Sequence, residues 1–410
     1  MTYNTKRSFG ERRNNRPNRS FNGRSQGNNG GNRKGRRQTI NPALFINKNI
    51  KEARAVEYTP THTFMDFALS EPIKRNIQHV GFSLPSSIQD KTIPLALDGK
   101  DVIGLANTGT GKTVAFLLPV LEKLSHSRKL NSVLIMAPTR ELAQQIDAEF
   151  QKFSAGMKLY SAICVGGVNI GSQIRQIRRG PHIIIGTPGR LKDLIQQRVL
   201  RLQTVDTLVL DEADRMLDMG FINDIRSIIS ELPVNRQTLC FSATMSDGVK
   251  IITGEFMKEP EVVSVKVTET NDHIYQDVVN YSDDQHKKDL LVEMLQKNEF
   301  EKVIVFGETK YGVQRLSDKL EKDGITSRAI HGNKSQSQRN RALDSFKKNE
   351  ANVLVATDVA ARGLDIPNVS HVINFDLPQS YDDYIHRIGR TGRGGKNGTA
   401  LTFVKNRRNN

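Results

Sequence analysis

From about residue 62 onward, short apolar runs alternate along the chain with longer amphipathic stretches. The runs are four to six residues long, and each ends in a polar or glycine-containing turn. This pattern is typical of buried parallel strands that are joined by helical crossovers. We therefore predict strands at residues 101–105, 133–136, 182–185, 207–210 and 238–241, and again at 302–306, 327–330, 352–356, 371–375 and 399–404.

The two groups of runs are separated by a polar stretch at residues 268–273, where no apolar period is visible. We therefore predict two α/β domains, at residues 62–266 and 274–406, with a short linker at 267–273. Each domain is expected to contain one parallel sheet. In open sheets of this kind, ligands bind beyond the carboxyl ends of the strands. The turns that follow the apolar runs are therefore the places where we expect chemistry.

The first 40 residues have a different composition. Residues 1–37 hold nine Arg, eight Asn and six Gly with almost no aliphatic side chains, so they cannot bury enough apolar surface to offset the entropy lost on ordering. We predict a disordered basic tail at residues 1–40. Tyr3, Phe9 and Phe21 are spaced among its charges, and arginine both contacts phosphates and stacks on bases. The tail is interpreted either as an RNA tether or as a solubilising segment.

Charge and cysteine content narrow the classes of protein. The 410 residues include 60 Lys and Arg against 44 Asp and Glu, a formal net charge of +16, which indicates a polyanionic partner, with nucleic acid ahead of an anionic membrane surface. The two cysteines, Cys164 and Cys240, are too few for a disulfide framework or a four-cysteine zinc site, and we expect both to be buried. No apolar run approaches the ~18 residues of a membrane span, and no secretory signal is visible. We expect a cytoplasmic protein without a membrane partner.

A glycine-rich loop follows the predicted strand at 101–105, and it reads Ala106-Asn107-Thr108-Gly109-Thr110-Gly111-Lys112-Thr113. The loop departs from the G-x-x-x-x-G-K-[ST] phosphate-binding pattern only at Ala106. Its glycines would let backbone N–H groups surround phosphate oxygens, and the helix that follows would add its positive N-terminal end. Lys112 would reach the β and γ phosphates, and the Thr113 hydroxyl would bind Mg²⁺. The alternative is a glycine-rich turn with an incidental lysine, but the strand before it and the apolar helix after it favour a nucleotide site.

A run of acidic residues, Asp211-Glu212-Ala213-Asp214, follows another predicted strand. Alone, such a run is often a solvated helix start. Here a buried strand would deliver it to the same sheet edge as the glycine-rich loop. Asp211 could then hold Mg²⁺ through water, and Glu212 could orient or deprotonate an attacking water.

Together these features resemble the DEAD-box RNA helicases, whose motifs are matched in order over residues 62–406. The resemblance implies two RecA-like domains in tandem, with ATP and Mg²⁺ as cofactors. The run from Gly81 to Gln89 resembles the family's Q motif, although a Ser-Ser pair replaces the commoner Thr-Pro. By resemblance Gln89 would read the adenine edge, and Phe64 would pack on the base. The alternative for Phe64 is an ordinary core aromatic.

The resemblance also assigns roles to residues of the remaining motifs. Nucleotide contacts fall on Thr108, Gly109, Thr110, Gly111, Lys112, Thr113, Gly363 and Asp365. RNA contacts fall on Thr139, Arg140, Gly167, Thr187, Gly189 and Arg190 in the first domain, and on Gln336, Arg339 and Thr357 in the second. Ser242, Thr244 and His386 would couple nucleotide state to domain closure, and Arg390 and Arg393 would act as arginine fingers on the γ-phosphate. In isolation each motif could equally be a turn, a helix cap or a basic patch.

The family resemblance implies an RNA-dependent ATPase that unwinds or remodels short RNA duplexes and RNA–protein complexes. The expected partner is RNA, single-stranded or as a short duplex and without sequence preference. Ribosomal or RNA-decay complexes are the further partners that such enzymes serve in bacteria. The protein is expected to act as a monomer. An ATP-gated RNA clamp or annealer is the alternative, and the motifs do not separate the two. A duplex-DNA translocase is disfavoured because the matched motifs grip a backbone without reading bases.

Overall fold

The computed structural model describes residues 1–2, 41–48, 58–107, 109–265, 273–361, 366, 368–392 and 397–406. Apart from residues 1–2 and 273, the predicted tail and the predicted linker lie outside these residues. Residues 1–39 and 40–410 form separate units, and the second unit contains both sheets.

The first sheet is parallel throughout and, within the described ranges, has seven strands in the order β3-β4-β2-β5-β6-β1-β7. Its strands are β1 Val102–Leu105, β2 Val133–Met136, β3 Ser161–Cys164, β4 Ile183–Gly186, β5 Thr207–Leu210, β6 Gln237–Ser242 and β7 Glu261–Ser264. The inner strands β2, β4 and β5 are buried at every position. Burial on both faces explains why these strands are continuous apolar runs rather than alternating ones.

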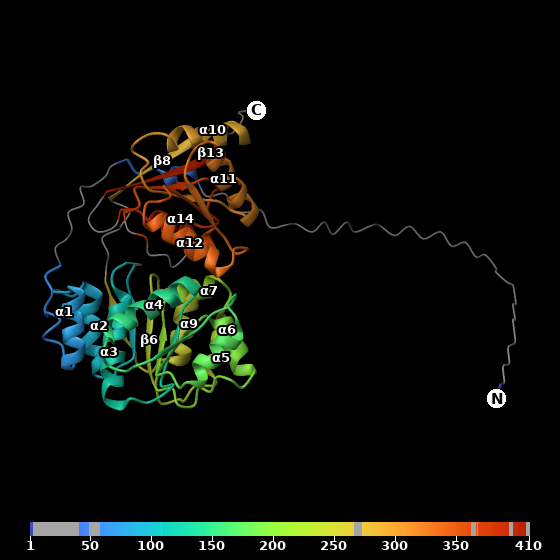
Figure 1. Ribbon diagram of the computed structural model, residues 1–410. Helices are drawn as coiled ribbons and strands as arrows, with labels where there is room; N and C mark the ends of the chain where they lie inside the picture. The colour runs from blue at the N-terminus through green and yellow to red at the C-terminus, as the bar shows by residue number, and fades with distance from the viewer. Residues whose placement is uncertain are drawn as a thin grey trace, which may run out of the picture. The chain divides into compact units, whose positions relative to one another are not determined.

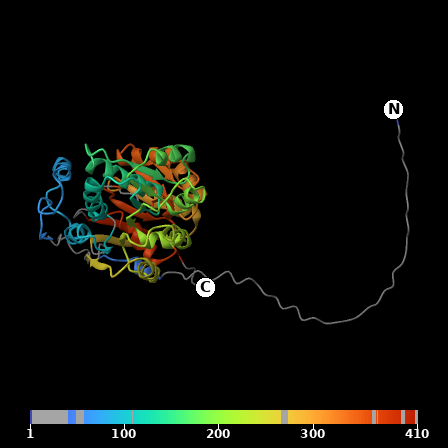
Figure 2. The ribbon, with the colours of Figure 1, turned by 90° about the horizontal axis from the view of Figure 1, so that it is seen from below.

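Helices cover both faces of this sheet, and they are α1 Glu71–Val80, α2 Ser87–Leu97, α3 Lys112–Ser127, α4 Arg140–Phe153, α5 Ile170–Arg178, α6 Pro188–Gln196, α7 Ala213–Asp218, α8 Ile222–Ile229 and α9 Asp247–Phe256. Alternate strand residues divide between two hydrophobic clusters. Ile135 and Val209 join α1–α4 in one cluster, and Leu134 and Leu208 join α5–α9 in the other. Figure 1 shows α1–α3 on one side of β6 with α5 and α6 on the other, and in Figure 2 α1 again lies at the outer margin of its helical layer.

The second sheet is also parallel, with six strands among the described residues in the order β10-β11-β9-β12-β13-β8. Its strands are β8 Ile274–Tyr281, β9 Val303–Phe306, β10 Ser327–Ile330, β11 Val353–Ala356, β12 His371–Asn374 and β13 Gly398–Lys405. Its helices are α10 Asp284–Leu295, α11 Lys310–Lys322, α12 Gln336–Lys347, α13 Asp358–Ala361 and α14 Tyr381–Ile388.

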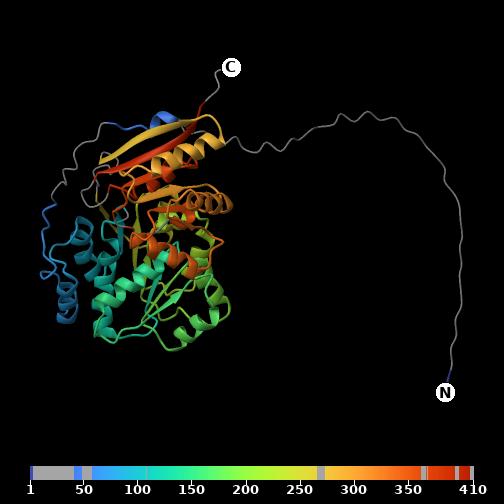
Figure 3. The ribbon, with the colours of Figure 1, turned by 45° about the horizontal axis from the view of Figure 1, so that its top comes forward.

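A short segment that precedes the first sheet in sequence packs on the second sheet. It contains the 3₁₀ helix η1 Pro42–Phe45, and Asn47 forms an antiparallel bridge with Gln276 of β8. Phe45 is fully buried, and its ring centroid lies 4.7 Å from that of Tyr384. Lys48 adds an ion pair to Asp277 at 2.9 Å. Figure 3 shows this blue segment beside β8 and β13.

The predicted fold class, two parallel α/β sheets in tandem, is confirmed. Cys164 and Cys240 are buried and form no disulfide. The strands that the sequence did not indicate are β3, β7 and β8, which lie at sheet edges and alternate or expose their side chains. These three strands therefore leave no continuous buried run, whereas β10, also at a sheet edge, is buried at three of its four positions and was predicted. None of the helices in the described ranges is long and apolar enough to span a membrane.

Candidate nucleotide and nucleic-acid site

The glycine-rich loop joins β1 to the N-terminus of α3. Gly109 and Gly111 have φ angles of +88° and +89°, in the left-handed region that favours glycine. Lys112, the first residue of α3, is 6% exposed, and its Nζ donates to the Ala106 carbonyl at 2.8 Å. The lysine ammonium is therefore held over the loop at the positive end of a 16-residue helix. This is the arrangement that a phosphate-binding loop needs. Thr108 lies outside the described residues.

The Q-motif residues contact this loop directly. Ser86 Oγ donates to the Thr110 carbonyl at 2.7 Å, and Gln89 Nε2 donates to the Gly111 carbonyl at 3.0 Å. Gln89 Oε1 in turn accepts from the Ser86 backbone N–H at 2.8 Å. A side chain at Gly111 would overlap the Gln89 amide. The amide predicted to read adenine is therefore engaged with the loop backbone in this arrangement.

Phe64 lies in the hydrophobic core rather than at an open surface. The residue is 1% exposed, and its ring centroid is 6.0 Å from those of both Phe67 and Phe82. This position fits the alternative interpretation of Phe64, in which it is an ordinary core aromatic. No face of the Phe64 ring is open to a base in this arrangement.

The sequence did not indicate a cluster that fixes the helix next to Gln89. The Asp90 carboxylate is almost fully buried and accepts from Tyr58 Oη at 2.5 Å, from the Thr61 N–H at 2.7 Å and from His62 Nδ1 at 2.7 Å. Burial would raise the pKa of Asp90, but these donors together lower it below its usual value. The segment before α1 is thus tied through Asp90 to α2, which contacts the phosphate loop.

The acidic run follows β5, as the sequence predicted, and both of its first carboxylates are buried. Burial raises the pKa of Asp211 to about 7, although the Lys112 ammonium opposes the shift. Burial would also raise the pKa of Glu212, but Arg215, Lys112 and Arg390 hold it below its usual value. Glu212 Oε2 lies 3.2 Å from Arg215 Nη1. Glu212 therefore carries its charge in a site that excludes most water.

The donor set at this edge fits a magnesium ion. Asp211 offers a buried carboxylate whose charged form is poorly compensated, and Thr113 offers a half-buried hydroxyl one residue after Lys112. Mg²⁺ prefers such hard oxygen ligands, and it takes one or two carboxylates together with substrate phosphates and water. No cluster of three or more His, Cys, Asp or Glu that could hold a metal occurs among the described residues, so the protein offers only part of a coordination shell.

Asp214 connects the acidic run to the Ser242-Ala243-Thr244 turn that follows β6. Its Oδ2 accepts from the backbone N–H of Ala243 at 3.0 Å and of Thr244 at 2.9 Å, and from Thr244 Oγ1 at 3.2 Å. Ser242 Oγ accepts from the Asp214 N–H at 3.3 Å and donates to the Thr244 carbonyl at 2.8 Å. The two predicted coupling residues of the first sheet are thus fixed to the helix that begins beside Glu212.

A groove of about 440 Å³ brings together most of the residues predicted to contact RNA. It is lined by Pro138, Thr139, Arg140, Glu141, Gly166, Thr187, Gly189, Arg190, Met219, Phe221, Gly332, Arg339 and Val359. Burial, with the nearby positive charges of Arg339 and Arg190, lowers the pKa of Arg140. Three guanidinium groups therefore converge on one cavity, which suits a polyanion. Thr139 also caps α4 by accepting from the Leu142 N–H at 3.2 Å.

Gly167 belongs to this groove through its contact with Arg140. Its φ angle is +70°, and a Cβ placed on it would lie 2.5 Å from Arg140 Cζ. A Cβ on the adjacent Gly166 would lie 3.3 Å from Arg140 Nη2, a tight contact but not an overlap. Only a residue without a side chain lets Arg140 lie over this turn.

Glu141 links the groove to the second sheet. Its carboxylate, 4% exposed, accepts from Gln336 Nε2 at 3.0 Å and pairs with Arg339 Nη2 at 3.0 Å. Arg339 Nε and Gln336 Oε1 are buried and have no hydrogen-bond partner among the described residues. Of these two residues predicted to bind RNA, Arg339 makes an ion pair and Gln336 a hydrogen bond with Glu141 of the first sheet's layer, and each keeps one buried polar atom without such a partner in the described part of the chain. Thr357 is also buried, before α13.

The residues of the last motif lie on α14 and just after it. His386 and Arg390 line a small cavity together with Arg215, which belongs to the first sheet. Arg390 is 3% exposed, and its charge contributes to the lowered pKa of Glu212. Arg387, which had no predicted role, makes a two-pronged ion pair with Asp358 at 2.6 and 2.7 Å. Arg393, Gly363 and Asp365 lie outside the described residues.

Two family models match this chain. The one described as DEAD/DEAH box helicase matches residues 86–252, and the one described as helicase conserved C-terminal domain matches residues 286–395. Together the matches cover more than half of the sequence. The chain belongs to the DEAD-box helicase family. The glycine-rich loop, the acidic run and much of the groove lie within the first match, and the arginines of α12 and α14 lie within the second.

Curated relatives and solved structures agree with this assignment. The helicase is 49% identical over 344 residues to the DEAD-box ATP-dependent RNA helicase CshA of Bacillus licheniformis. This match covers 84% of this chain and 71% of the relative. It is 48% identical to CshA of Bacillus subtilis, with 84% and 70% covered. It is an enzyme of the ATP-dependent RNA helicase class.

Two solved structures resemble the fold of the helicase. S. cerevisiae Dbp5 bound to RNA and ADP BeF3 has a TM-score of 0.75 at 32% identity, covering 84% of this chain and 90% of that one. Mss116p bound to ssRNA and AMP-PNP has a TM-score of 0.74 at 34% identity, covering 82% and 73%.

Sequence reasoning missed the residues that connect the motifs to one another. Glu141, Asp214 and Arg215 lie within or beside quoted motifs, yet no role was assigned to them. The available signal was their charge inside segments that are otherwise apolar or buried, because a buried charge needs a partner. That signal could indicate that a partner exists, but not which residue it is.

Proposed function

We propose that this helicase uses ATP hydrolysis to separate short RNA duplexes locally, by closing its two domains on one strand. The observation that carries the proposal is the Glu141 contact, because it places Gln336 and Arg339 of the second sheet against the groove that holds Arg140. A strand lying in this groove would touch both domains. The resemblance to Dbp5 bound to RNA and ADP BeF3 supports RNA and a nucleotide as the ligands.

The residues of the first sheet would bind the nucleotide and activate water. Backbone N–H groups around Gly109 and Gly111 would hold phosphate oxygens, and Lys112 would neutralise charge on the β and γ phosphates. Thr113 and Asp211 would hold Mg²⁺, the latter through water, and the ion would stabilise negative charge on the phosphates. Glu212, ionised and buried, would orient the attacking water and accept its proton.

The second domain would complete the catalytic site only when the domains are closed. Arg390 already influences Glu212 electrostatically, and it would stabilise the charge that develops on the γ-phosphate, together with Arg393. An arginine finger of this kind typically contributes ~10³–10⁵ in rate. Because RNA would favour closure, RNA would stimulate hydrolysis, and by linkage ATP would tighten RNA binding.

Strand displacement tests this proposal. A short RNA duplex with one labelled strand is incubated with the full chain and ATP, and release of the labelled strand is followed. We expect release with ATP and little release without it. An ATP-gated clamp or annealer would instead show tighter RNA binding with ATP but no strand release, which would contradict the proposal.

Glu212→Gln tests the assigned base, with Glu231→Gln at an exposed position as the matched control. The Glu212 variant should bind ATP and RNA but hydrolyse ATP very slowly, whereas the control should turn over normally. Normal turnover of Glu212→Gln would overturn the assignment.

The RNA targets are also a matter of proposal. We propose RNA of ribosome assembly or RNA decay as the physiological substrate and a monomer as the working form. Crosslinking of the protein to RNA in cells, followed by sequencing of the captured RNA, tests the first. Light scattering of the full chain with and without RNA tests the second.

A further inference from the structure

A cavity of about 770 Å³ lies among the helices that cover the first sheet, away from the sites described above. Its walls are α1, the end of α3 and the loop between α4 and β3, and its lining residues include Arg75, Asn76, His126, Arg128, Met157 and Lys158. α3 begins at the phosphate loop and has 16 residues, so its far end is about 24 Å away. α4 likewise begins at Arg140 and ends beside the cavity. The cavity therefore lies at the opposite edge of the sheet from the nucleotide and the groove.

The charge of this cavity is positive and uncompensated. Arg75, Arg128 and Lys158 are exposed, and none of them has an ion pair or a side-chain hydrogen bond with another described residue. No carboxylate is among the residues that line the cavity. The nearby Glu122 is already engaged, because its two oxygens accept from the Ser70 N–H and contact His126 Nε2, both at 2.7 Å.

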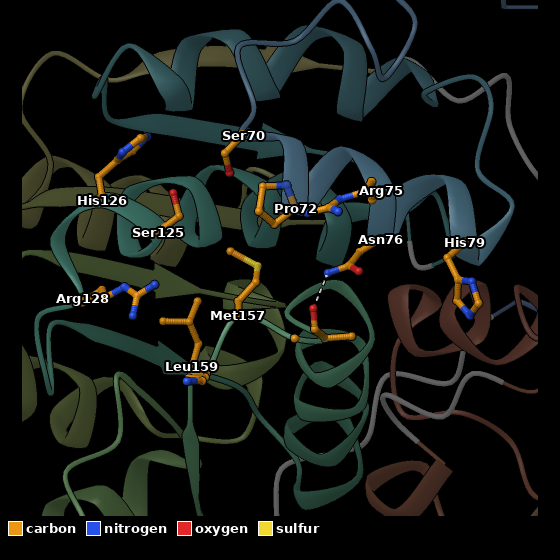
Figure 4. A pocket seen from close by; sticks show the side chains of 13 residues that line it. Ser70, Pro72, Arg75, Asn76, His79, Ser125, His126, Arg128, Met157 and Leu159 are labelled. Atoms are coloured by element: carbon orange, nitrogen blue, oxygen red, sulfur yellow. Dashed lines mark hydrogen bonds between the residues drawn. The ribbon is translucent and has the colours of Figure 1, made fainter.

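The cavity also has an apolar floor and a polar group of fixed orientation. Met157 and Leu159 are almost fully buried, and Figure 4 shows Met157 at the centre, between Arg128 and Asn76. Asn76 Nδ2 donates to the carbonyls of Phe153 and Ala155 at 2.8 and 3.0 Å. The amide orientation is therefore fixed, and it leaves Asn76 Oδ1 as an acceptor for a ligand N–H group.

We propose that this cavity, defined by Arg75, Asn76, Arg128, Met157 and Lys158, is a docking site for an acidic peptide segment of a partner protein. Carboxylates of the segment would pair with the three cations, an aliphatic side chain would contact Met157, and a backbone N–H would donate to Asn76 Oδ1. The volume is within the ~300–1,000 Å³ range of well-formed ligand sites. The protein's own tail is excluded as the occupant because its residues 1–37 carry eleven Lys and Arg and one acidic residue.

RNA is the other polyanion to consider, and the lining disfavours it. Binding of single strands combines phosphate contacts with stacking on aromatic side chains, and the lining residues include no Phe, Tyr or Trp. Because Arg and His can also stack on bases, labelled oligouridine is included in the test as the competing ligand. A second basic recess, lined by Arg198, Arg201 and Glu231 among others, is smaller at about 340 Å³ and contains a carboxylate. It therefore serves as a matched control rather than as a rival site.

The test compares two double charge reversals in the full chain. Arg75→Glu with Arg128→Glu alters the proposed site, and Arg198→Glu with Arg201→Glu alters the control recess by the same net charge. The pairs are also matched in backbone, because Arg128 and Arg198 have φ angles of +46° and +57°. Fluorescence anisotropy would measure binding of a labelled peptide that alternates Glu and Leu, a Glu-Ser version of it, and labelled oligouridine. The tail is common to all the proteins, so its own binding of acidic peptide is the same background in each.

We expect the Arg75→Glu and Arg128→Glu variant to bind the Glu-Leu peptide about 10-fold or more weakly than the unaltered chain, since reversed charges both remove attraction and add repulsion. The Arg198→Glu and Arg201→Glu control should change peptide affinity by less than about 2-fold, because exposed charges that do not contact the peptide contribute little to its binding. The Glu-Ser peptide should bind more weakly than the Glu-Leu peptide to the unaltered chain. RNA-stimulated ATP hydrolysis should be equal in both variants, which also reports that each has folded.

Three results would overturn the proposal. An equal loss of affinity for the Glu-Leu peptide in both variants would mean that the peptide is held by non-specific charge attraction. A loss of oligouridine binding in the site variant alone would make the cavity an RNA surface. Equal affinity for the Glu-Leu and Glu-Ser peptides would contradict the apolar contact with Met157.

Discussion

Gly167→Ala should weaken RNA binding by displacing Arg140 while leaving the nucleotide site intact. Gly167 has a φ angle of +70°, and a Cβ there would overlap the Arg140 guanidinium. The overlapping atoms are the far end of the flexible Arg140 side chain, so the arginine would relieve the clash by leaving its place over the turn. Arg140 would then no longer converge with Arg190 and Arg339 on the groove.

The size of the effect follows from the two consequences of the substitution. The left-handed backbone costs an alanine about 1–2 kcal/mol in stability. Loss of one charge-assisted contact to a phosphate costs about 1.5–3 kcal/mol in binding, or ~10- to 140-fold in affinity. If one phosphate contact is lost, the slope of log affinity against log salt should fall by about 0.7 for a single strand.

Gly99→Ala is the matched control, because Gly99 also has a positive φ, +78°, but a Cβ there would meet nothing within 4 Å. Both variants should lose similar stability in urea unfolding. Anisotropy of labelled oligouridine, titrated at several salt concentrations with ATP analogue present, should show the affinity loss and the reduced slope only in Gly167→Ala. If both variants bind RNA alike, Arg140 does not act through this turn and the reasoning fails.

Phe45→Ala should destabilise the region around the second sheet by about 3–5 kcal/mol, as deletion of a fully buried Phe side chain does. Urea unfolding followed by Tyr fluorescence would measure this loss. Leu44→Ala, at an exposed position of the same helix, should leave the stability unchanged. Asp90→Asn should cost about 1–3 kcal/mol at neutral pH through its lost charged acceptor. Because folding lowers the pKa of Asp90, this stabilisation is present above the unfolded value of about 3.9 and is lost as pH falls below it. The gap between Asp90→Asn and the unaltered chain should therefore narrow as the pH falls from about 3.9 through the lower pKa of the folded state, and a gap that does not change with pH below about 3.9 would refute the ionic role. Deletion of residues 1–37 should weaken RNA binding and flatten its salt dependence but preserve turnover at saturating RNA; a large loss of that turnover would contradict a tethering role.

Most strands that the sequence predicted are buried completely or nearly so, and β13, which alternates between buried and half-buried positions, is the exception. β2 and β5 are buried at every position, so their apolar runs are unambiguous. The edge strand β3 alternates between buried and half-buried positions, and β7 exposes most of its residues, so neither forms a continuous buried run. The segment around Phe45 could not be predicted at all. Its burial depends on Ile274, Tyr384 and Ala400, which are more than 200 residues away in sequence.

The same distinction applies to the site. Residue types within one loop, such as Gly111 and Lys112, follow from local backbone chemistry and can be read from spacing. The partners of those residues depend on contacts between distant segments. Glu141 meets Gln336 across 195 positions, and Asp214 meets Thr244 across 30. No spacing rule connects such pairs, so the sequence can require a partner for a buried charge without identifying it.

Gln89 illustrates how one side chain can serve both interpretations. Its Nε2 donates to the Gly111 carbonyl, so the amide helps to set the conformation of the phosphate loop. If Gln89 also reads an adenine edge, it must share or give up that bond. A single neutral hydrogen bond contributes about 0.5–1.5 kcal/mol, which a new bond to the base would replace. The exchange would therefore cost little, and it would make the loop respond to whether a base is present. Base recognition and phosphate binding would then be linked through one amide.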